Sequence, residues 1–330
     1  MRLNVSEVRR AVSGCSLLAA ALLLASCGGG GQANSFTPTR IIAFGDETNV
    51  IDDTNSPGNG SKYSVNATAL DSTIDCFGFP LWIQTVGRAF GGIVFPQCNP
   101  GPTPVDSPPS RIRATFGAKA ADIAAQIDAQ SAESPIQAGD MVTVLVGVND
   151  VLEQYAQYPS VSEPVLTANV QAAGTEVARQ VNRLADAGAK VVISTIPDVG
   201  YSPYAYTEKM AHIDIDRQAL IIRLVSTFNT ALRSNITNDG HKIGLVTMDE
   251  LVESVAVNPG LDGFNDTIDG VCDLGQSMLS PPSVLDCTNL TLISNGNATS
   301  YLWADDRHLS AGGQLSLGNL AAIRARNNPF

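Results

Sequence analysis

The stretch that decides the fold is RIIAFGDE, at residues 40–47. After the initial arginine the run is apolar, until Gly45 and Asp46 end it. A short continuous apolar run that stops at such a turn predicts a strand buried on both faces, as in a parallel sheet. Residues 141–146 (MVTVLV) repeat the pattern and end in GVND at residues 147–150. Polar residues therefore follow directly on two predicted strands.

The rest of the chain alternates between strand and helix patterns. The predicted elements are two more strands at residues 191–196 and 243–248, and helices at residues 80–90, 120–129, 166–187, 217–233 and 311–326. The polar or proline-rich stretches at residues 47–76, 96–109 and 258–299 are predicted as loops. This alternation predicts an α/β fold, a three-layer αβα sandwich around a mostly parallel sheet, in one domain at residues 39–330. In such folds ligands bind beyond the carboxyl ends of the strands.

Four short blocks fall in a fixed order along this pattern. They are FGDE at residues 44–47, FGA at 116–118, GVND at 147–150 and DDRH at 305–308. The chain resembles the GDSL/SGNH hydrolase family, whose blocks are Gly-Asp-Ser, a lone glycine, Gly-x-Asn-Asp and Asp-x-x-His. The resemblance extends over nearly all of the chain from about residue 40 to residue 325. It implies the α/β fold given above and an ester-hydrolase site without metal or cofactor.

The resemblance also assigns roles by position. His308 would be the general base and Asp305 the carboxylate that orients it, as in other acyl-transfer triads. Gly117, through its backbone N–H, and Asn149, through its side chain, would donate to the oxyanion. Asp150 is expected to cap the helix after the second strand.

The nucleophile position departs from the family, because it holds Glu47 where the family has serine. A carboxylate is a poor acyl-transfer nucleophile, since attack on an ester carbonyl yields a reactive anhydride. We expect Glu47 to accept hydrogen bonds from Gly117, Asn149 and protonated His308, which would fill the oxyanion hole and lower the pKa of Glu47. Three other uses stay open: Thr48 as a displaced nucleophile, Glu47 as general base for a water, and a metal held by Asp46, Glu47, Asp305 and His308.

Three functions are therefore compatible with the sequence. The first is hydrolysis of an acyl or acetyl ester of a lipid or carbohydrate by an altered mechanism. The second is a pseudoenzyme that binds a small ester, glycan or lipid ligand without cleaving it. The third is a structural envelope protein with a vestigial cleft, although the retention of His308, Asn149 and Gly117 argues against it.

The N-terminus predicts export. Arginines at positions 2, 9 and 10 precede a short apolar run, and Leu24-Ala25-Ser26-Cys27 resembles a bacterial lipobox. We expect residues 1–26 to be a signal peptide, Cys27 to be lipidated, and the glycine-rich residues 27–38 to be a tether. The lipid would be the only contact with a membrane, and the predicted location is the bacterial cell envelope, in the outer membrane.

Cysteine and charge patterns agree with export. The remaining cysteines form two pairs that are close in sequence, and we expect Cys76–Cys98 and Cys272–Cys287 disulfides. Their spacing lacks the close pairs typical of zinc sites. The net charge of −12 disfavours nucleic acid as a partner.

Overall fold

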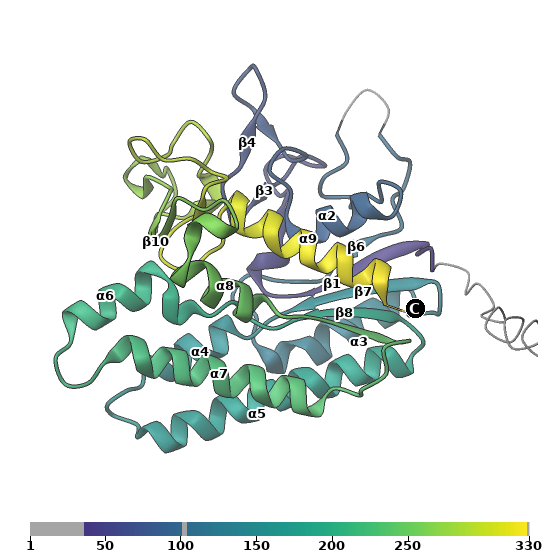
Figure 1. The fold of residues 1–330 in the computed structure, drawn as a ribbon. Helices are drawn as coiled ribbons and strands as arrows, with labels where there is room; N and C mark the ends of the chain where they lie inside the picture. Colours follow the sequence, from purple (N-terminus) through teal and green to yellow (C-terminus); the bar gives the residue numbers. More distant parts are fainter. Residues whose placement is uncertain (1–35, 101–103, 329) are drawn as a thin grey trace, which may run out of the picture. The chain divides into compact units, whose positions relative to one another are not determined.

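The centre of the domain is a five-stranded sheet in the order β6-β1-β7-β8-β9, with every neighbouring pair parallel (Figure 1). The strands are β6 (Arg111–Ile112), β1 (Arg40–Gly45), β7 (Asp140–Leu145), β8 (Lys190–Ser194) and β9 (Ile243–Val246). The computed structural model describes residues 36–100, 104–328 and 330, and the part from residue 36 onward is one compact unit. The predicted signal peptide, most of the tether and Cys27 lie outside the described residues.

Helices cover both faces of the sheet, which confirms the predicted three-layer fold class (Figure 1). One layer contains α3 (Ile123–Glu133), α4 (Val148–Tyr155), α5 (Glu163–Asp186) and α7 (Arg217–Asn235), and the other contains α2 (Trp82–Ala89) and α9 (Ala311–Asn327). Two more helices are α6 (Pro203–Ala211) and α8 (Met248–Val257). The long predicted helices are all present, whereas α4, α6 and α8 were not predicted. These three are short, with eight to ten residues each, so their apolar periodicity is brief.

Burial explains why the two central strands were recognisable. All six residues of β1 and all six of β7 are buried, because helices lie against both faces of the sheet. The apolar stripe of α5 includes Leu166, Val170 and Val181, and it packs against α7. Each such fully buried side chain stabilises the fold by about 1.5–3 kcal/mol relative to an exposed one.

Two of the stretches predicted as loops contain short strands, so that part of the prediction is wrong. Residues 47–76 contain η1 (Glu47–Asn49), the pair β2 (Ile51–Asp52) and β3 (Ser61–Lys62), and the pair β4 (Ala67–Thr68) and β5 (Ile74–Asp75). Residues 258–299 contain β10 (Asp266–Gly270), which pairs in parallel with β11 (Tyr301–Trp303). The other 3-10 turns are η2 (Ala120–Asp122), η3 (Val199–Tyr201), η4 (Pro259–Leu261), η5 (Leu274–Gln276) and η6 (Val284–Asp286).

These two irregular segments pack on each other above the sheet, near the labels β3 and β10 in Figure 1. Val65, Val271 and Val284 are buried together in a small second core. The Asn66 amide donates to the carbonyls of Leu285 and Cys287, at 3.2 and 3.0 Å. Strands of two residues that depend on such distant partners leave no local pattern to read, which is why they were missed.

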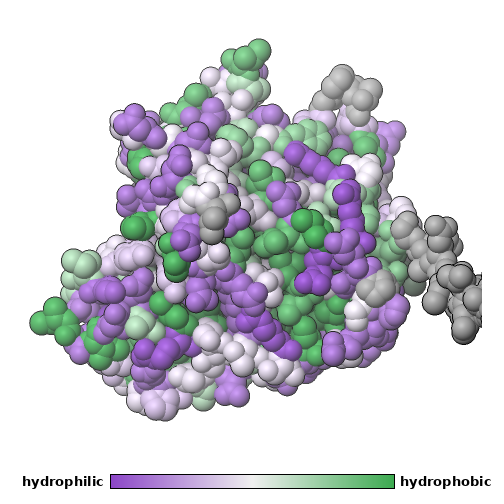
Figure 2. Space-filling view, viewed as in Figure 1, coloured by the Kyte–Doolittle hydropathy of each residue, from purple (hydrophilic) through white to green (hydrophobic). Residues whose placement is uncertain are grey.

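The surface of the domain is mixed. On the face drawn in Figure 2, hydrophilic and hydrophobic residues are interspersed. Within the described residues, no helix has both the length and the apolar character needed to cross a bilayer.

Both predicted disulfides form, Cys76–Cys98 and Cys272–Cys287, with S–S distances of 2.08 and 1.94 Å. The second closes a loop with a sequence separation of 15 around the small second core. Cross-linking a loop of that length stabilises a fold by about 3 kcal/mol, mainly by restricting the unfolded chain.

We therefore expect Cys272→Ala/Cys287→Ala to lower the free energy of unfolding by about 3 kcal/mol. Chemical denaturation of the oxidised native chain and of the double variant measures the difference. Reduction of the native chain breaks both bonds and should therefore cause a larger loss than the double variant shows. Reduction of the double variant breaks only Cys76–Cys98 and should have a smaller effect than reduction of the native chain. An unchanged midpoint after verified reduction would refute the structural role of both bonds.

Candidate active site

The turn after β1 carries the residue at the nucleophile position. Gly45 has φ +134°, and a Cβ there would lie 1.9 Å from the Leu145 carbonyl oxygen, so only glycine lets β1 end this close to β7. Asp46 caps η1, since its Oδ1 accepts the Thr48 backbone N–H at 3.0 Å. The turn places Glu47 at the carboxyl edge of the sheet.

Two buried amides hold this turn in place. The Asn49 amide donates to the carbonyls of Asp46 and Leu145 at 3.1 and 2.9 Å, and its Oδ1 accepts the Trp82 indole N–H at 2.9 Å. Gln126 accepts the Gly45 N–H and donates to the Gly45 carbonyl, both at 2.9 Å. Sequence reasoning missed both amides, because a lone buried Asn or Gln has no spacing that marks it.

The Glu47 carboxylate lies among the predicted oxyanion donors. Its side chain is only 6% exposed. Oε2 accepts the Gly117 N–H at 2.9 Å and the Asn149 amide at 3.0 Å, and that amide is 3.3 Å from Oε1. The backbone N–H of Glu47 also stabilises its own carboxylate. The donors that the family resemblance assigns to an oxyanion are thus occupied by a side chain of the protein.

The other side of the carboxylate faces the histidine. His308 Nδ1 lies 2.7 Å from Asp305 Oδ2, and Asp305 Oδ1 accepts the backbone N–H groups of His308 and Arg307 at 2.7 and 2.9 Å. His308 Nε2 lies 3.5 Å from Glu47 Oε1. That distance is long for a hydrogen bond, so the contact is an ion pair, and it makes His308 the link between two carboxylates.

Glu47, His308 and Asp305 form a row of three ionisable groups, and their charges determine the protonation of each. Burial disfavours the imidazolium, but Asp305 and then Glu47 outweigh it and raise the pKa of His308 to about 10. Burial likewise opposes both carboxylates, yet the charge of His308 lowers the pKa values of Glu47 and Asp305, and so do the hydrogen bonds from His308 to Asp305 and from the Gly117 N–H to Glu47. At neutral pH the row is therefore carboxylate, imidazolium, carboxylate. A protonated imidazole has no lone pair with which to remove a proton.

The neighbouring acids have other functions. Burial, and then the charge of Glu47, raise the pKa of Asp46 well above its usual value. The prediction that Asp150 caps the helix after the second strand is wrong, because Asp150 lies within the first turn of α4. Its Oδ2 instead accepts the Ala120 N–H at 2.9 Å. That bond joins α4, which carries Asn149, to the segment just after Gly117.

The described residues contain no group of three or more His, Cys, Asp or Glu side chains that could hold a metal ion. The alternative metal site formed by Asp46, Glu47, Asp305 and His308 is therefore not present.

Comparison with known proteins accords with this geometry. The family model described as GDSL-like lipase/acylhydrolase matches residues 41–320, and that range contains all five residues of the site. The chain belongs to this family. A comparison with curated proteins finds no match.

The solved structures that resemble this GDSL family member are distant. An acetyl xylan esterase, AlAXEase, matches at 12% identity over 85% of this chain and 96% of that chain, with a TM-score of 0.42. A catalytic mutant of Axe2, an acetylxylan esterase from Geobacillus stearothermophilus, matches at 12% identity over 89% and 96%, with a TM-score of 0.43. A lipolytic G-D-S-L protein from Veillonella parvula DSM 2008 matches at 11% identity over 87% and 95%, with a TM-score of 0.38.

In this GDSL family member, aromatic rings lie beside the histidine. Tyr63 stacks on Phe116 with ring centroids 4.9 Å apart, and its own ring lies 6.2 Å from that of His308. Phe116 is 64% exposed, so the pair presents an apolar wall to solvent. A shallow cleft of about 400 Å³ adjoins the site, lined by Gly117, Lys119, Asn149, Leu152, Glu153, Ala156, Tyr204 and Arg307.

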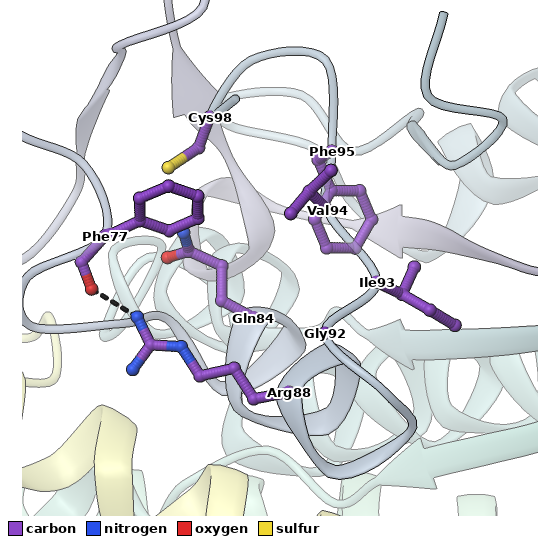
Figure 3. A pocket seen from close by; sticks show the side chains of 8 residues that line it. All are labelled: Phe77, Gln84, Arg88, Gly92, Ile93, Val94, Phe95 and Cys98. Atoms are coloured by element: carbon purple, nitrogen blue, oxygen red, sulfur yellow. Dashed lines mark hydrogen bonds between the residues drawn. The ribbon is translucent and has the colours of Figure 1, made fainter. Parts of the chain in front are cut away.

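A second pocket has no part in this site. It encloses about 180 Å³ and is lined by Phe77, Gln84, Arg88, Gly92, Ile93, Val94, Phe95 and Cys98 (Figure 3). Arg88 reaches across it to donate to the Phe77 carbonyl. Cys98 is bonded to Cys76, so this pocket offers no free nucleophile.

If Glu47, His308 and Asp305 are all charged in the native site, removal of one carboxylate changes the pKa of His308. We expect Glu47→Gln to lower the pKa of His308 from about 10 by about 1–3 units, because a carboxylate within a few ångströms favours the imidazolium by that amount. NMR titration of the histidine ring protons measures it. An unchanged His308 midpoint contradicts the ion pair.

Proposed function

We propose that this chain is an exported lipoprotein of the bacterial cell envelope whose cleft binds a small acyl or acetyl ester of a lipid or carbohydrate. We further propose that the native site holds such a ligand without serine-type hydrolysis, so that for this chemistry it is a pseudoenzyme. Lipidation of Cys27 would attach it to the outer membrane. Membership of the family supports the proposed class of ligand. Glu47, where the family has serine, supports the proposed loss of hydrolysis.

One observation carries the proposal: the Glu47 carboxylate accepts hydrogen bonds from Gly117 and Asn149, the two donors that the family resemblance assigns to the oxyanion. An ester carbonyl cannot accept the Gly117 and Asn149 donors until that carboxylate moves away. A protonated His308 cannot act as a base there either. The alternative, hydrolysis by a water that Glu47 activates, needs the same displacement and then leaves the charge of Glu47 without its donors.

Hydrolysis and binding test the proposal together. The purified chain is assayed on short-chain p-nitrophenyl esters beside His308→Ala, and its melting temperature is measured with acetylated sugars and short acyl esters. We expect equal, background rates for both proteins and a ligand-dependent rise in the melting temperature of the native chain. Turnover that His308→Ala abolishes would instead establish a working ester hydrolase. A melting temperature that no ligand shifts would point to a vestigial cleft.

The anchor has a separate test. A cysteine at the end of a lipobox is the group to which acyl chains are attached. We expect Cys27→Ser to abolish incorporation of a labelled fatty acid and to move the protein from the membrane fraction to the soluble fraction. Cys15→Ser, inside the predicted signal peptide, is the matched control and should leave labelling intact. Equal labelling of the Cys27→Ser protein would rule out the anchor.

A further inference from the structure

The two oxygens of the Glu47 carboxylate have different surroundings. Oε2 is held by Gly117 and Asn149, at 2.9 and 3.0 Å. Oε1 points toward His308 Nε2, 3.5 Å away, and its contact with the Asn149 amide is longer, at 3.3 Å. One oxygen is thus fixed in the oxyanion hole, and the other lies beside a proton donor. That division suits a carboxylate that reacts through one oxygen and keeps the other in place.

The electrophile decides what such a carboxylate can do. Attack on a carbonyl carbon gives an anhydride, whereas attack on a saturated carbon gives an ordinary ester of Glu47. An ester of Glu47 would have its carbonyl oxygen, Oε2, already inside the oxyanion hole. A site built for ester hydrolysis would then act on an ester that is part of the protein.

We propose that Glu47 Oε1 attacks the saturated carbon of an epoxide, and that the site hydrolyses the resulting glutamyl ester to release a vicinal diol. The proposal goes beyond the ester-binding function proposed above and does not rest on it. It uses no group other than the carboxylate, Asp305–His308, the oxyanion donors and water.

In the first step an electron pair of Oε1 forms a bond to the epoxide carbon, and the carbon–oxygen bond of the ring breaks. The ring oxygen leaves as an alkoxide and takes the proton from His308 Nε2. His308 becomes neutral, and Glu47 becomes an uncharged ester. The resting ion pair of Glu47 and His308 therefore supplies both the nucleophile and the acid that this step needs.

In the second step water attacks Cδ of the glutamyl ester, and neutral His308 removes a proton from that water while Asp305 holds the imidazolium that forms. The negative charge develops on Oε2, where Gly117 and Asn149 donate to it. Collapse breaks the bond between Cδ and the alkyl oxygen, which leaves as the alcohol with the proton from His308. The new Glu47 acid returns its own proton to His308, so the sum is epoxide plus water giving diol.

The position of the acid selects this substrate class. A leaving halide needs no proton, but an epoxide oxygen leaves as a strong base and gains most from an acid beside it. The carboxylate is only 6% exposed, so the attacked carbon must be a terminal, unhindered one. The stacked Tyr63 and Phe116 rings beside His308 offer an apolar wall to an aryl or alkyl substituent. Styrene oxide meets these conditions and is the probe.

The test follows oxygen atoms. The full chain, in molar excess over styrene oxide, is incubated in water labelled with the heavy oxygen isotope. The masses of the diol and of the peptide containing Glu47 are then measured by mass spectrometry. We expect the first-turnover diol to carry unlabelled oxygen from Glu47, and Glu47 to gain the label only when epoxide is present. We expect diol formation on the order of 10²-fold faster than with Glu47→Gln, an effect within the usual range for a positioned catalytic group.

Glu250→Gln is the matched control, since Glu250 lies on α8 and pairs with Arg233 outside the site. The Glu250→Gln variant should incorporate the heavy isotope at Glu47 and form diol at the same rate as the native chain. Labelled diol with unlabelled Glu47 would show direct attack by water and overturn the proposal. A folded native chain that forms no diol and gains no label would overturn it as well. Neither result depends on the ester assays, so failure here is distinct from failure of the ester-binding proposal.

Discussion

Glu47→Ser is expected to hydrolyse short-chain p-nitrophenyl esters on the order of 10³-fold faster than the native chain, within the range that a positioned base contributes. The substitution has two effects at once. It removes the carboxylate from the Gly117 and Asn149 donors, so that an ester carbonyl can accept them. It also removes one of the two charges that raise the pKa of His308, so that neutral imidazole forms at lower pH.

The pH profile gives this prediction a second readout. The active form of Glu47→Ser needs neutral His308, so its rate should rise as pH increases through the pKa of His308 and then level off. Asp305 still favours the imidazolium, and the midpoint should therefore lie below about 10 but above the usual histidine value. Glu47→Ser/His308→Ala is the control and should lose the gained activity. A folded Glu47→Ser protein that is inactive on every short acyl ester would show that the rest of the site is not competent.

The parts of the fold that could be read from the sequence are those with long or continuous patterns. β1 and β7 are buried on both faces, which makes them unbroken apolar runs. α5 and α7 are long enough, at 24 and 19 residues, for their apolar stripes to repeat several times. β6 has two residues and pairs only with β1, so no pattern of its own identifies it as an edge strand.

The site was more predictable than the loops around it. The blocks at Glu47, Gly117, Asn149 and His308 are far apart in sequence, but each follows a strand or precedes a helix at the same edge of the sheet. Parallel topology brings such positions together. The supporting contacts were not predictable, because the Gln126 and Asn49 amides act on backbone groups whose positions only the folded chain defines.

Both proposals depend on one residue, Glu47, which stands where the family has serine. The same two hydrogen bonds that, in our proposal, keep an ester carbonyl from the Gly117 and Asn149 donors hold Glu47 Oε2 where the carbonyl of a Glu47 ester would lie. The same contact that keeps His308 protonated places an acid next to Oε1. The proposed loss of serine chemistry and the proposed gain of carboxylate chemistry would therefore both follow from one geometry, and the rate assays on Glu47→Ser and the isotope test on the native chain address them separately.

His308→Ala is expected to destabilise the fold by about 3–5 kcal/mol at pH 8, the usual cost of removing one member of a buried charge network. It leaves the Glu47 and Asp305 carboxylates buried without the cation between them. Their pKa values should then rise above the unfolded values of about 4. A raised pKa gives stability that is present below the unfolded value and lost as pH increases through the folded one. The native chain gains stability from His308 in the same way between about pH 10 and the unfolded histidine value of about 6.5, so the deficit should shrink on acidification below about pH 6.5.

A double-mutant cycle separates this charge effect from lost packing. Glu47→Ser/His308→Ala leaves one unpaired carboxylate instead of two, so it should be more stable at pH 8 than His308→Ala alone, although it has one more substitution. Chemical denaturation of the native chain, both single variants and the double variant at pH 8, about pH 6.5 and pH 5 provides the comparison. Additive losses that do not change with pH would mean that His308 contributes through packing, and the row of three charges would then not be the state of the native site.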